Sequence, residues 1–376
     1  MEGIGVSKSK LRARCAAFNI PQKSNLYVYF ILYAITLLKE GGELVVIFPY
    51  SWKKSTIAPF LNIVFDSLGF IQKDITVAGN PFEGVPLVDV CILKFIKGRH
   101  GTTEKLLFDV NASCLTKDVP SDARIEPTEY TVPLKSICMI KRGLTTFHNS
   151  MFINPPATLS DYFCPIVSSP KSVPQMTTKE ARTDNLLLLP KSDTLNGEAI
   201  SYIELFRQQI LKDRKPSTLC NKISTEKYWY SLAKQEPAEI IFPYIIRRQP
   251  CFILNDGQYI ARDNFYLLYN KKYSMVLIAL LNNYYVYSQL EVKGKNYGNG
   301  LLKIQKYDVD SIQVVDPSHL EEHTMSKLTS LAGKLIERQS DSIIEQITKE
   351  LDPYYNNPNI SEIYFNLKSE RLKYEC

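Results

Sequence analysis

The sequence predicts an α/β fold for its N-terminal part, because two helical patterns alternate there with two strand patterns. In residues 26–38 the apolar side chains recur at the spacing of one helix face. Residues 44–48 are apolar without alternation, as in a strand that is buried on both faces. A second helical pattern covers residues 56–65, and a second strand pattern covers residues 85–95. This order predicts half of a doubly wound α/β domain.

The first helix has recognisable ends. Ser24 or Asn25 is suited to act as its N-cap, since both side chains accept hydrogen bonds from free backbone N–H groups. Gly41 and Gly42 follow the helical pattern, and glycine readily adopts the left-handed conformation that ends helices. We therefore expect a helix, a glycine turn and then the buried strand.

Composition excludes several classes of protein. With 376 residues, 45% apolar residues and 22% charged residues, the chain suits a globular protein of two or three domains. No apolar run approaches the roughly 20 residues that span a bilayer, and the N-terminus lacks the apolar core of a signal peptide. The eight cysteines include no CxxC pair, so we expect reduced thiols and no metal site. These features predict a cytoplasmic protein without a membrane partner, and the net charge of +6 suits a partner that carries phosphates.

Aromatic residues occupy two positions where a ligand could bind. Tyr50 and Trp52 follow the buried strand, at the edge where open α/β sheets bind ligands. They either line a pocket there or pack the corner between strand and helix. Phe82 lies in a loop with glycine and proline before the second strand, where its ring either projects toward a ligand or plugs the loop.

The chain changes character after the first domain, which we assign to residues 1–97. Residues 98–131 are polar with one strand-like run and are predicted to be a linker. A second domain is expected at residues 132–316, and a helical segment at residues 317–376. Within that segment, residues 320–351 have the pattern of one long amphipathic helix.

The second domain combines strand-forming runs with basic side chains. Residues 228–269 are rich in strand formers, and Asn255-Asp256-Gly257 is a hairpin-turn signal. Arginines on a sheet among aromatic residues suit a nucleic-acid surface, although ordinary solvent-facing arginines remain an alternative. The basic and aromatic residues in question are Arg247, Arg248, Arg262, Tyr244, Phe252 and Tyr259.

A helix and a glycine-rich basic loop follow. Residues 275–290 are predicted to form one helix, and residues 293–303 form a loop that is rich in lysine and glycine. A glycine-rich backbone can approach phosphates closely. We therefore expect DNA-backbone contacts from Lys293, Lys295, Asn296 and Lys303, or else a plain turn.

The order of these segments resembles a known family. The run LYVYFILYAITLLKEGGELVVIFPYSW and the later NPFEGVPLVDVCILKF are similar to the back half of the catalytic domain of adenine-N6 DNA methyltransferases from bacterial restriction–modification systems. The resemblance continues to about Pro317. It implies a partial Rossmann-like methyltransferase sheet (α/β), followed by an α+β target-recognition domain and a C-terminal helix.

The resemblance also implies roles for single residues. Phe82 matches the phenylalanine that stacks on the extruded adenine. The segment with Arg142, Gly143, Thr145 and Thr146 matches the start of the recognition domain, although Phe147 stands where a second glycine is usual. Pro243 and Arg247 match a "P-x-x-x-R" strand, residues 263–266 match "D-N-x-Y", and the lysine–glycine loop matches a "ggG-ll-k" segment. The expected DNA-binding residues are Arg142, Thr145, Arg247, Arg248, Lys293, Lys295, Asn296 and Lys303.

Two motifs of the resembled family are missing from the sequence. One is the strand and glycine-rich turn that hold S-adenosylmethionine, and the other is the catalytic tetrapeptide of Asn or Asp, two prolines and an aromatic residue. Asn80 precedes only one proline, and the asparagine of Asn154-Pro155-Pro156-Ala157 lacks the aromatic residue, so both are predicted to be turns.

Three functional hypotheses remain open. The chain is a DNA adenine-N6 methyltransferase component whose cofactor site and tetrapeptide lie on a companion polypeptide. Alternatively, it is a non-catalytic DNA-binding specificity module, or an inactive truncated methyltransferase. The expected partner is double-stranded DNA, and in the first case S-adenosylmethionine is expected to be bound mainly by the companion chain.

Overall fold

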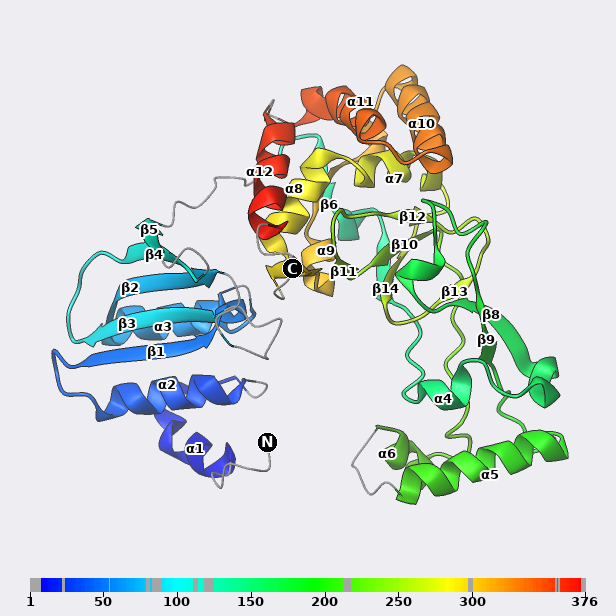
Figure 1. The fold of residues 1–376 in the computed structure, drawn as a ribbon, viewed down its shortest axis with the longest axis horizontal. Coiled ribbons are helices and arrows are strands. Elements are labelled where there is room, and N and C mark those ends of the chain that lie inside the picture. The colour runs from blue at the N-terminus through cyan, green and yellow to red at the C-terminus, as the bar shows by residue number, and fades with distance from the viewer. Residues whose placement is uncertain are drawn as a thin grey trace. The chain divides into compact units, whose positions relative to one another are not determined.

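A computed structural model describes the protein at residues 8–21, 24–53, 55–78, 82, 90–110, 114–117, 125–212, 218–296, 300–355, 357 and 359–372. The chain divides into two compact units (Figure 1). The first comprises residues 1–123, 291–303 and 365–376, and the second comprises residues 124–290 and 304–364. A membrane-crossing helix would need a longer apolar stretch than any helix offers in the part of the chain that is described.

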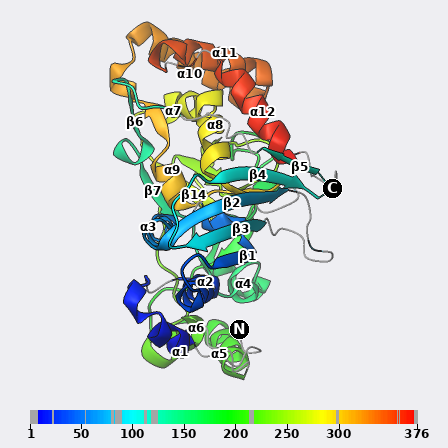
Figure 2. The same ribbon diagram turned by 90° about the vertical axis from the view of Figure 1, so that its left-hand side faces the viewer.

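The first unit is built around a five-stranded sheet. Its strands are ordered β1-β3-β2-β4-β5, as Figure 2 shows. Neighbouring strands run antiparallel except β2 and β4, which are parallel. The predicted helices and strands are confirmed by α2, β1, α3 and β3. Asn25 occupies the N-cap position of α2, but its side chain makes no capping hydrogen bond. Helices and strands of this unit include α1 (Lys8–Arg14), α2 (Leu26–Leu37), β1 (Glu43–Pro49), α3 (Ala58–Leu68), β2 (Gly69–Ala78), β3 (Val90–Lys97), β4 (Glu104–Asp109), β5 (Cys114–Lys117), β15 (Lys295–Asn296) and β16 (Leu302–Lys303).

The strand β1 is buried on one face only, so the prediction of burial on both faces is wrong. Leu44, Val46 and Phe48 belong to the core that α1, α2 and α3 form with the sheet. On the opposite face Val45 and Ile47 are 62% and 55% exposed. The strand lies at the end of the strand order and pairs with β3 alone among the described residues. The exposed apolar residues therefore form a strip along an open sheet edge.

Part of the predicted linker belongs to this sheet. Within residues 98–131, β4 pairs with β2 over six residues and β5 pairs with β4 over four. The strand-like run 106–110 is thus confirmed as most of β4, but the segment is not simply a connection between domains. The strands pair there because Leu106, which is buried, extends the apolar face of β2.

The second unit contains several small sheets that pack around buried apolar residues. A four-stranded antiparallel sheet has the order β12-β10-β14-β7, and β8 lies between β13 and β9 in a three-stranded sheet. Helices and strands of this unit include β6 (Thr131–Pro133), β7 (Met139–Arg142), α4 (Asn149–Phe152), β8 (Phe163–Val167), β9 (Asp184–Leu187), α5 (Gly197–Lys212), α6 (Thr218–Thr225), β10 (Ile240–Pro243), β11 (Ile245–Ile246), β12 (Ile253–Leu254), β13 (Ile260–Ala261), β14 (Phe265–Tyr269), α7 (Ser274–Leu281), α9 (Lys306–Asp310), β17 (Gln313–Val315), α10 (Glu322–Glu337) and α11 (Asp341–Leu351).

The predicted helix 275–290 is two helices, α7 and α8 (Tyr284–Lys293), because buried asparagines interrupt it. Asn282 accepts a hydrogen bond from the backbone N–H of Phe252 and donates to the carbonyl of the same residue, both at 3.0 Å. Its side-chain oxygen also accepts the hydroxyl of Tyr287 at 2.9 Å. The amide is buried, so these bonds fix the break rather than leave a polar group unsatisfied.

The predicted C-terminal helix is also divided. Residues 320–351 contain α10 and α11, which are separated by Arg338 in an extended conformation. Ser340 caps α11 by accepting a hydrogen bond from the backbone N–H of Ser342. A further helix, α12 (Ile360–Leu372), follows. The segment is therefore helical as expected, but it consists of several helices.

Candidate nucleic-acid interface

The glycine at position 143 lets two distant segments meet. A Cβ atom at Gly143 would lie 2.1 Å from the carbonyl oxygen of Arg262, so only glycine fits there. Beside it the N–H of Gly143 donates to the carbonyl of Phe265, and the N–H of Leu144 donates to the carbonyl of Ala261, both at 2.9 Å. The predicted glycine turn is thus a close contact with the backbone around the D-N-x-Y segment.

Arg142 is held at the end of β7 yet remains exposed. Its Nε donates to the carbonyl of Asp263 at 3.1 Å, across 121 positions of sequence. Its guanidinium carbon lies 5.0 Å from the ring centroid of Tyr244, within the range of a cation–π contact. These two contacts limit the positions of the side chain, which favours a defined geometry for binding an anion or a base edge.

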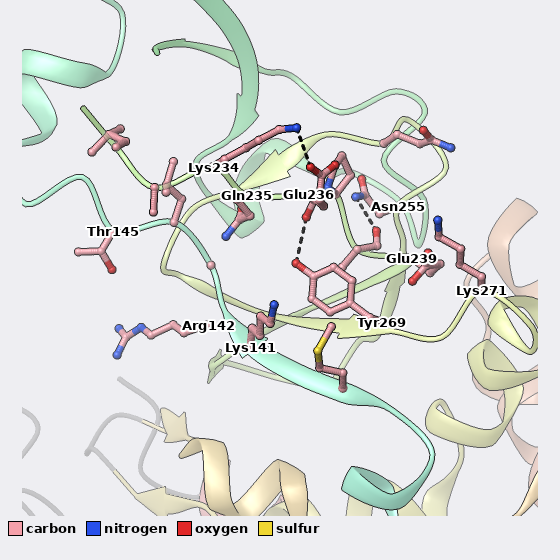
Figure 3. Close-up of a pocket in the computed structure, with 18 of the residues that line it drawn as sticks. Lys141, Arg142, Thr145, Lys234, Gln235, Glu236, Glu239, Asn255, Tyr269 and Lys271 are labelled. Atoms are coloured by element: carbon pink, nitrogen blue, oxygen red, sulfur yellow. Dashed lines mark hydrogen bonds and ion pairs between the residues drawn. The ribbon is translucent and has the colours of Figure 1, made fainter. Parts of the chain in front are cut away.

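A cavity of about 990 Å³ opens beside this segment (Figure 3). Its wall contains five cationic side chains and two carboxylates, so cations are in excess by three. Lys234 and Glu236 form an exposed ion pair at 3.0 Å, and Lys141 lies 5.4 Å from the ring centroid of Tyr269. The charged residues of the wall are Lys141, Arg142, Lys222, Lys234, Lys271, Glu236 and Glu239. Thr145 also lines the cavity, so two of the predicted DNA-binding residues lie in one site.

Asn255 supports the cavity wall from below the surface. Its side-chain nitrogen donates to the carbonyls of Ala238 at 2.8 Å and Tyr259 at 3.0 Å. Its side-chain oxygen accepts the hydroxyl of Thr178 at 2.9 Å. The predicted turn at 255–257 exists, but it does not join a β-hairpin, because β12 pairs with β10 and β13 pairs with β8. The asparagine instead fixes a loop whose flanking strands belong to different sheets.

The P-x-x-x-R and D-N-x-Y segments meet as sheet neighbours. Pro243 pairs with Phe265 in the register of β10 and β14, and the side chain of Asn264 donates to the carbonyl of Ser168 at 2.7 Å. Arg247 and Arg248 follow β11 and are exposed, but they do not line the cavity. Phe252 is buried and stacks on Phe242 with a centroid distance of 4.1 Å. Phe252 therefore belongs to the core and not to the expected nucleic-acid surface.

The lysine–glycine loop belongs to the first unit and is a short hairpin. Lys295 pairs with Lys303, and Asn296 pairs with Leu302, in the antiparallel ladder of β15 and β16. Lys293 is the last residue of α8. Residues 297–299, at the centre of the predicted loop, lie outside the described residues. Lys295 and Lys303, two of the predicted DNA-binding lysines, therefore lie opposite each other on paired strands, and Lys293 precedes Lys295 by two residues.

A buried ion pair fixes one end of this hairpin. Arg371 on α12 donates to both carboxylate oxygens of Glu291 on α8, at 2.7 and 2.8 Å, and both side chains are at most 3% exposed. The arginine also donates through Nη1 to the carbonyl of Gly300. Gly300 has φ of 66°, the left-handed region that favours glycine. The C-terminal helix thus fixes the backbone two residues before β16.

Phe82 lies in the connection between the antiparallel strands β2 and β3. Its side chain is 40% exposed, whereas its neighbours in the connection lie outside the described residues. Trp52 packs the corner between β1 and α3, where its Nε1 donates to Cys91 Sγ at 3.2 Å. Of the two alternatives for Trp52, corner packing is the one observed.

The remaining candidates have structural roles. Asn154 accepts the backbone N–H of Asn185 and donates to the carboxylate of Asp184, both at 2.9 Å, so it is a turn residue as predicted. Burial raises the pKa of Cys91 to about 11 and that of Cys138 to about 12, which keeps both thiols protonated. The described residues contain no group of three or more His, Cys, Asp or Glu side chains suited to a metal ion.

Sequence reasoning missed most of the cavity wall. Lys141, Lys222, Lys234 and Lys271 come from four separate segments, and no local pattern distinguishes them from ordinary surface lysines. Phe147 also lines the cavity. The sequence alone marks Phe147 as unusual, since it replaces a glycine that is usual at that position of the resembled family.

Comparisons with known proteins relate most of the chain to restriction–modification enzymes. Residues 118–353 match the family model for the C-terminal domain of the Type II methyltransferase M.Eco57I. The structure is similar to that of the Type IIL restriction-modification enzyme MmeI in complex with DNA, with a TM-score of 0.61 and 12% identity over 96% of this chain and 55% of that chain. For the type IIG restriction endonuclease BpuSI the TM-score is 0.46, with 13% identity over 99% of this chain and 52% of that chain.

The chain therefore spans about half the length of these two proteins. The similarity to MmeI shows a shared fold. No curated protein matches the sequence.

Proposed function

The chain belongs to the family of the Type II methyltransferase M.Eco57I C-terminal domain, and from this premise we propose that it is the DNA-recognition component of a restriction–modification adenine-N6 methyltransferase. The observation that carries the proposal is the cationic cavity beside Gly143, where Arg142 and Thr145 meet Lys141 and Lys271. DNA is a polyanion whose phosphates attract such a surface, and an arginine can read a guanine edge or grip a phosphate. MmeI, which shares the fold, was solved as a complex with DNA, and this supports DNA as the partner.

The division of labour within the chain is part of the proposal. Residues 132–316 recognise the DNA target, residues 317–376 support them, and residues 1–97 complete a methyltransferase sheet. Arg247 and Arg248 add further phosphate contacts. Lys293, Lys295, Asn296 and Lys303 bind the DNA backbone, whose phosphates attract cationic side chains.

The described residues do not fit a binding site for S-adenosylmethionine. The connection from β1 to α3 contains no glycine, and its Trp52 is packed in the core. A cofactor site of this fold class needs a glycine-rich turn that lets the ligand approach the backbone. We therefore propose that a companion polypeptide holds the cofactor and the Asn-Pro-Pro-aromatic tetrapeptide.

The open edge of β1 supports a companion. Val45 and Ile47 expose apolar surface along a strand that pairs on one side only among the described residues. Sheet edges of this kind pair readily with further strands. Added methyltransferase strands would pair with the edge, and the helices that connect them would cover the apolar strip.

Phe82 has the role of receiving the extruded adenine. The amine of adenine is out of reach inside a duplex, so a methyltransferase swings the nucleotide out of the stack. A half-exposed phenylalanine between β2 and β3 can stack on the base, which is worth about 1–3 kcal/mol. The companion's tetrapeptide would hold the amine.

A second candidate function is a DNA-binding specificity module without catalysis. The cationic cavity serves both functions equally, and the apolar strip of β1 then acts only as a docking surface for another protein. The test is co-expression with a candidate companion polypeptide that carries the glycine-rich turn and the Asn-Pro-Pro-aromatic tetrapeptide, followed by transfer of a labelled methyl group from S-adenosylmethionine to DNA. We expect N6-methyladenine only when both chains are present, and its loss with Phe82→Ala.

Methylation by the companion alone at the full rate would favour the specificity module. Methylation by this chain alone would refute the need for a companion. Phe365→Ala is the matched control for Phe82→Ala, because Phe365 is equally exposed at 41%, against 40% for Phe82, and lies on α12.

A further inference from the structure

Phe147 combines two unfavourable features. Its φ is 60°, a left-handed conformation that bulky side chains rarely adopt, and its aromatic side chain is 49% exposed. Strained residues of this kind persist where the surrounding structure imposes them, and they cluster at functional sites. A glycine would take the same backbone conformation without strain. Position 147 thus has a backbone conformation that favours glycine but carries an aromatic side chain.

The segments on both sides of Phe147 are fixed by packing and hydrogen bonds. Thr146 is buried, and its hydroxyl donates to Asn149 Oδ1 at 2.7 Å. The N–H of Asp263 donates to the carbonyl of Leu144 at 3.0 Å, and the N–H of Met151 donates to the carbonyl of His148 at 3.1 Å. The backbone at 147 has little freedom to relax. Its ring is therefore presented to the solvent from a fixed backbone.

The surroundings of the ring indicate what it meets. Phe147 lines the cationic cavity, and Lys222 Nζ lies 5.5 Å from the ring centroid. The excess of positive charge attracts a polyanion, and an exposed ring favours a flat apolar surface. A nucleic acid offers both, since its phosphates are negative and each base has a π-face. An apolar peptide would satisfy the ring but not the charge.

We propose that Phe147 is a wedge that contacts the bases of bound duplex DNA and stacks on one of them at an unstacked step. Proteins that deform DNA insert phenylalanine side chains between base pairs in this way. The inference rests on the proposed DNA-recognition function and adds a residue that the sequence resemblance does not assign. Arg142 and the lysines of the cavity would hold the adjacent phosphates.

The test uses photocrosslinking together with affinity. The probe is a pool of 30-base-pair duplexes of random sequence in which 5-iododeoxyuridine replaces thymidine. Irradiation of the full chain bound to this pool, followed by digestion and mass spectrometry, is expected to give a base adduct on Phe147. The result that overturns the proposal is adduct formation elsewhere in the chain with Phe147 unmodified.

Three variants separate a base contact from a structural role. Phe147→Gly removes the ring and relieves the backbone strain, so we expect an unchanged or higher melting temperature and a duplex affinity lower by about 5- to 150-fold. Phe147→Trp keeps an aromatic surface and should bind within about threefold of the native chain. Phe365→Leu removes a ring that is 41% exposed and also has a lysine nearby, and it should not change the affinity.

Native affinity of Phe147→Gly would overturn the wedge while leaving DNA recognition intact. Failure of the native chain to bind the pool even at low salt would instead overturn the proposed function, and the wedge with it. The two failures are thus distinguishable in one experiment.

Discussion

A single methyl group at position 143 tests the contact on which the candidate interface is built. In Gly143→Ala the new Cβ would lie 2.1 Å from the carbonyl oxygen of Arg262 and 2.6 Å from that of Ala261. Both atoms belong to backbone that is held by its own hydrogen bonds, so neither can rotate away as a side chain could. The two segments must separate.

The expected loss in free energy of unfolding follows from the contacts that break when the two segments separate. Two backbone hydrogen bonds, from Gly143 to Phe265 and from Leu144 to Ala261, are both 2.9 Å long and would weaken. Each contributes about 1 kcal/mol, and forcing extra volume into a packed site costs a further 1–3 kcal/mol or so. We expect Gly143→Ala to lower the free energy of unfolding by about 3–5 kcal/mol.

The assay is urea unfolding followed by tryptophan fluorescence, to which buried Trp229 of the second unit contributes together with buried Trp52 of the first. The matched control is Gly333→Ala, because Gly333 lies inside α10 and an added Cβ there would have no atom within 4 Å. Alanine is the better helix former, so this control should gain about 0.5–1 kcal/mol. A loss below about 1 kcal/mol for Gly143→Ala would refute the close contact.

Three further predictions concern other parts of the chain. Glu291→Ala leaves Arg371 buried without its carboxylate and should lower the free energy of unfolding by about 3–5 kcal/mol, measured in urea. The double variant Glu291→Leu with Arg371→Met should recover much of this loss. Equal losses in the two variants would contradict a buried ion pair. Cys138, whose pKa burial raises from 9.0 to about 12, should not react with a disulfide reagent at pH 8 until the protein is unfolded, and rapid labelling of the folded chain would count against its burial. The folded thiol keeps its proton at a pH where the unfolded thiol ionises. The contribution of Cys138 to the free energy of unfolding is therefore present below pH 9 and is lost as the pH rises toward about 12. Melting temperatures measured across this pH range can test it. Arg142→Ala should weaken duplex binding by about 1–3 kcal/mol in fluorescence anisotropy, and native affinity would exclude Arg142 from the interface.

Local sequence patterns predicted the segments that depend on near neighbours along the chain. The helices α2 and α3 follow from apolar periodicity, the strands β1 and β3 follow from strand-forming apolar runs, and Asn154 follows from the turn preference of its Asn-Pro pair. The one-sided burial of β1 did not follow from the sequence, because an apolar run shows which residues are apolar but not which of them the fold covers. Val45 and Ile47 are as apolar as a doubly buried strand requires, although one face of the strand is open.

Breaks within apolar helical patterns also escaped prediction. Asn282 interrupts 275–290 only because its amide finds the backbone of Phe252, thirty positions earlier. The Arg338–Ser340 break between α10 and α11 likewise depends on a local cap that competes with a continuous amphipathic pattern. Such nonlocal or competing bonds have no signature in a window of sequence.

The candidate interface was half predictable. The resemblance selected Arg142 and Thr145, and the structure brings both to the cationic cavity. It did not select Lys141, Lys234 or Lys271, since these residues gather only after β7 pairs with β14. The left-handed backbone at Phe147 explains why glycine is usual there, a point that the sequence could raise but not resolve.

The central claim, that the cationic cavity binds duplex DNA, is tested most directly by the salt dependence of binding. The measurement is the affinity for a 30-base-pair duplex between 50 and 200 mM salt, for the native chain, for Lys141→Ala with Lys271→Ala, and for the exposed control Lys191→Ala. We predict steep salt dependence in the native chain and the control, and a slope of log K against log salt that is shallower by about two in the double variant. An unchanged slope and affinity in the double variant would contradict the account.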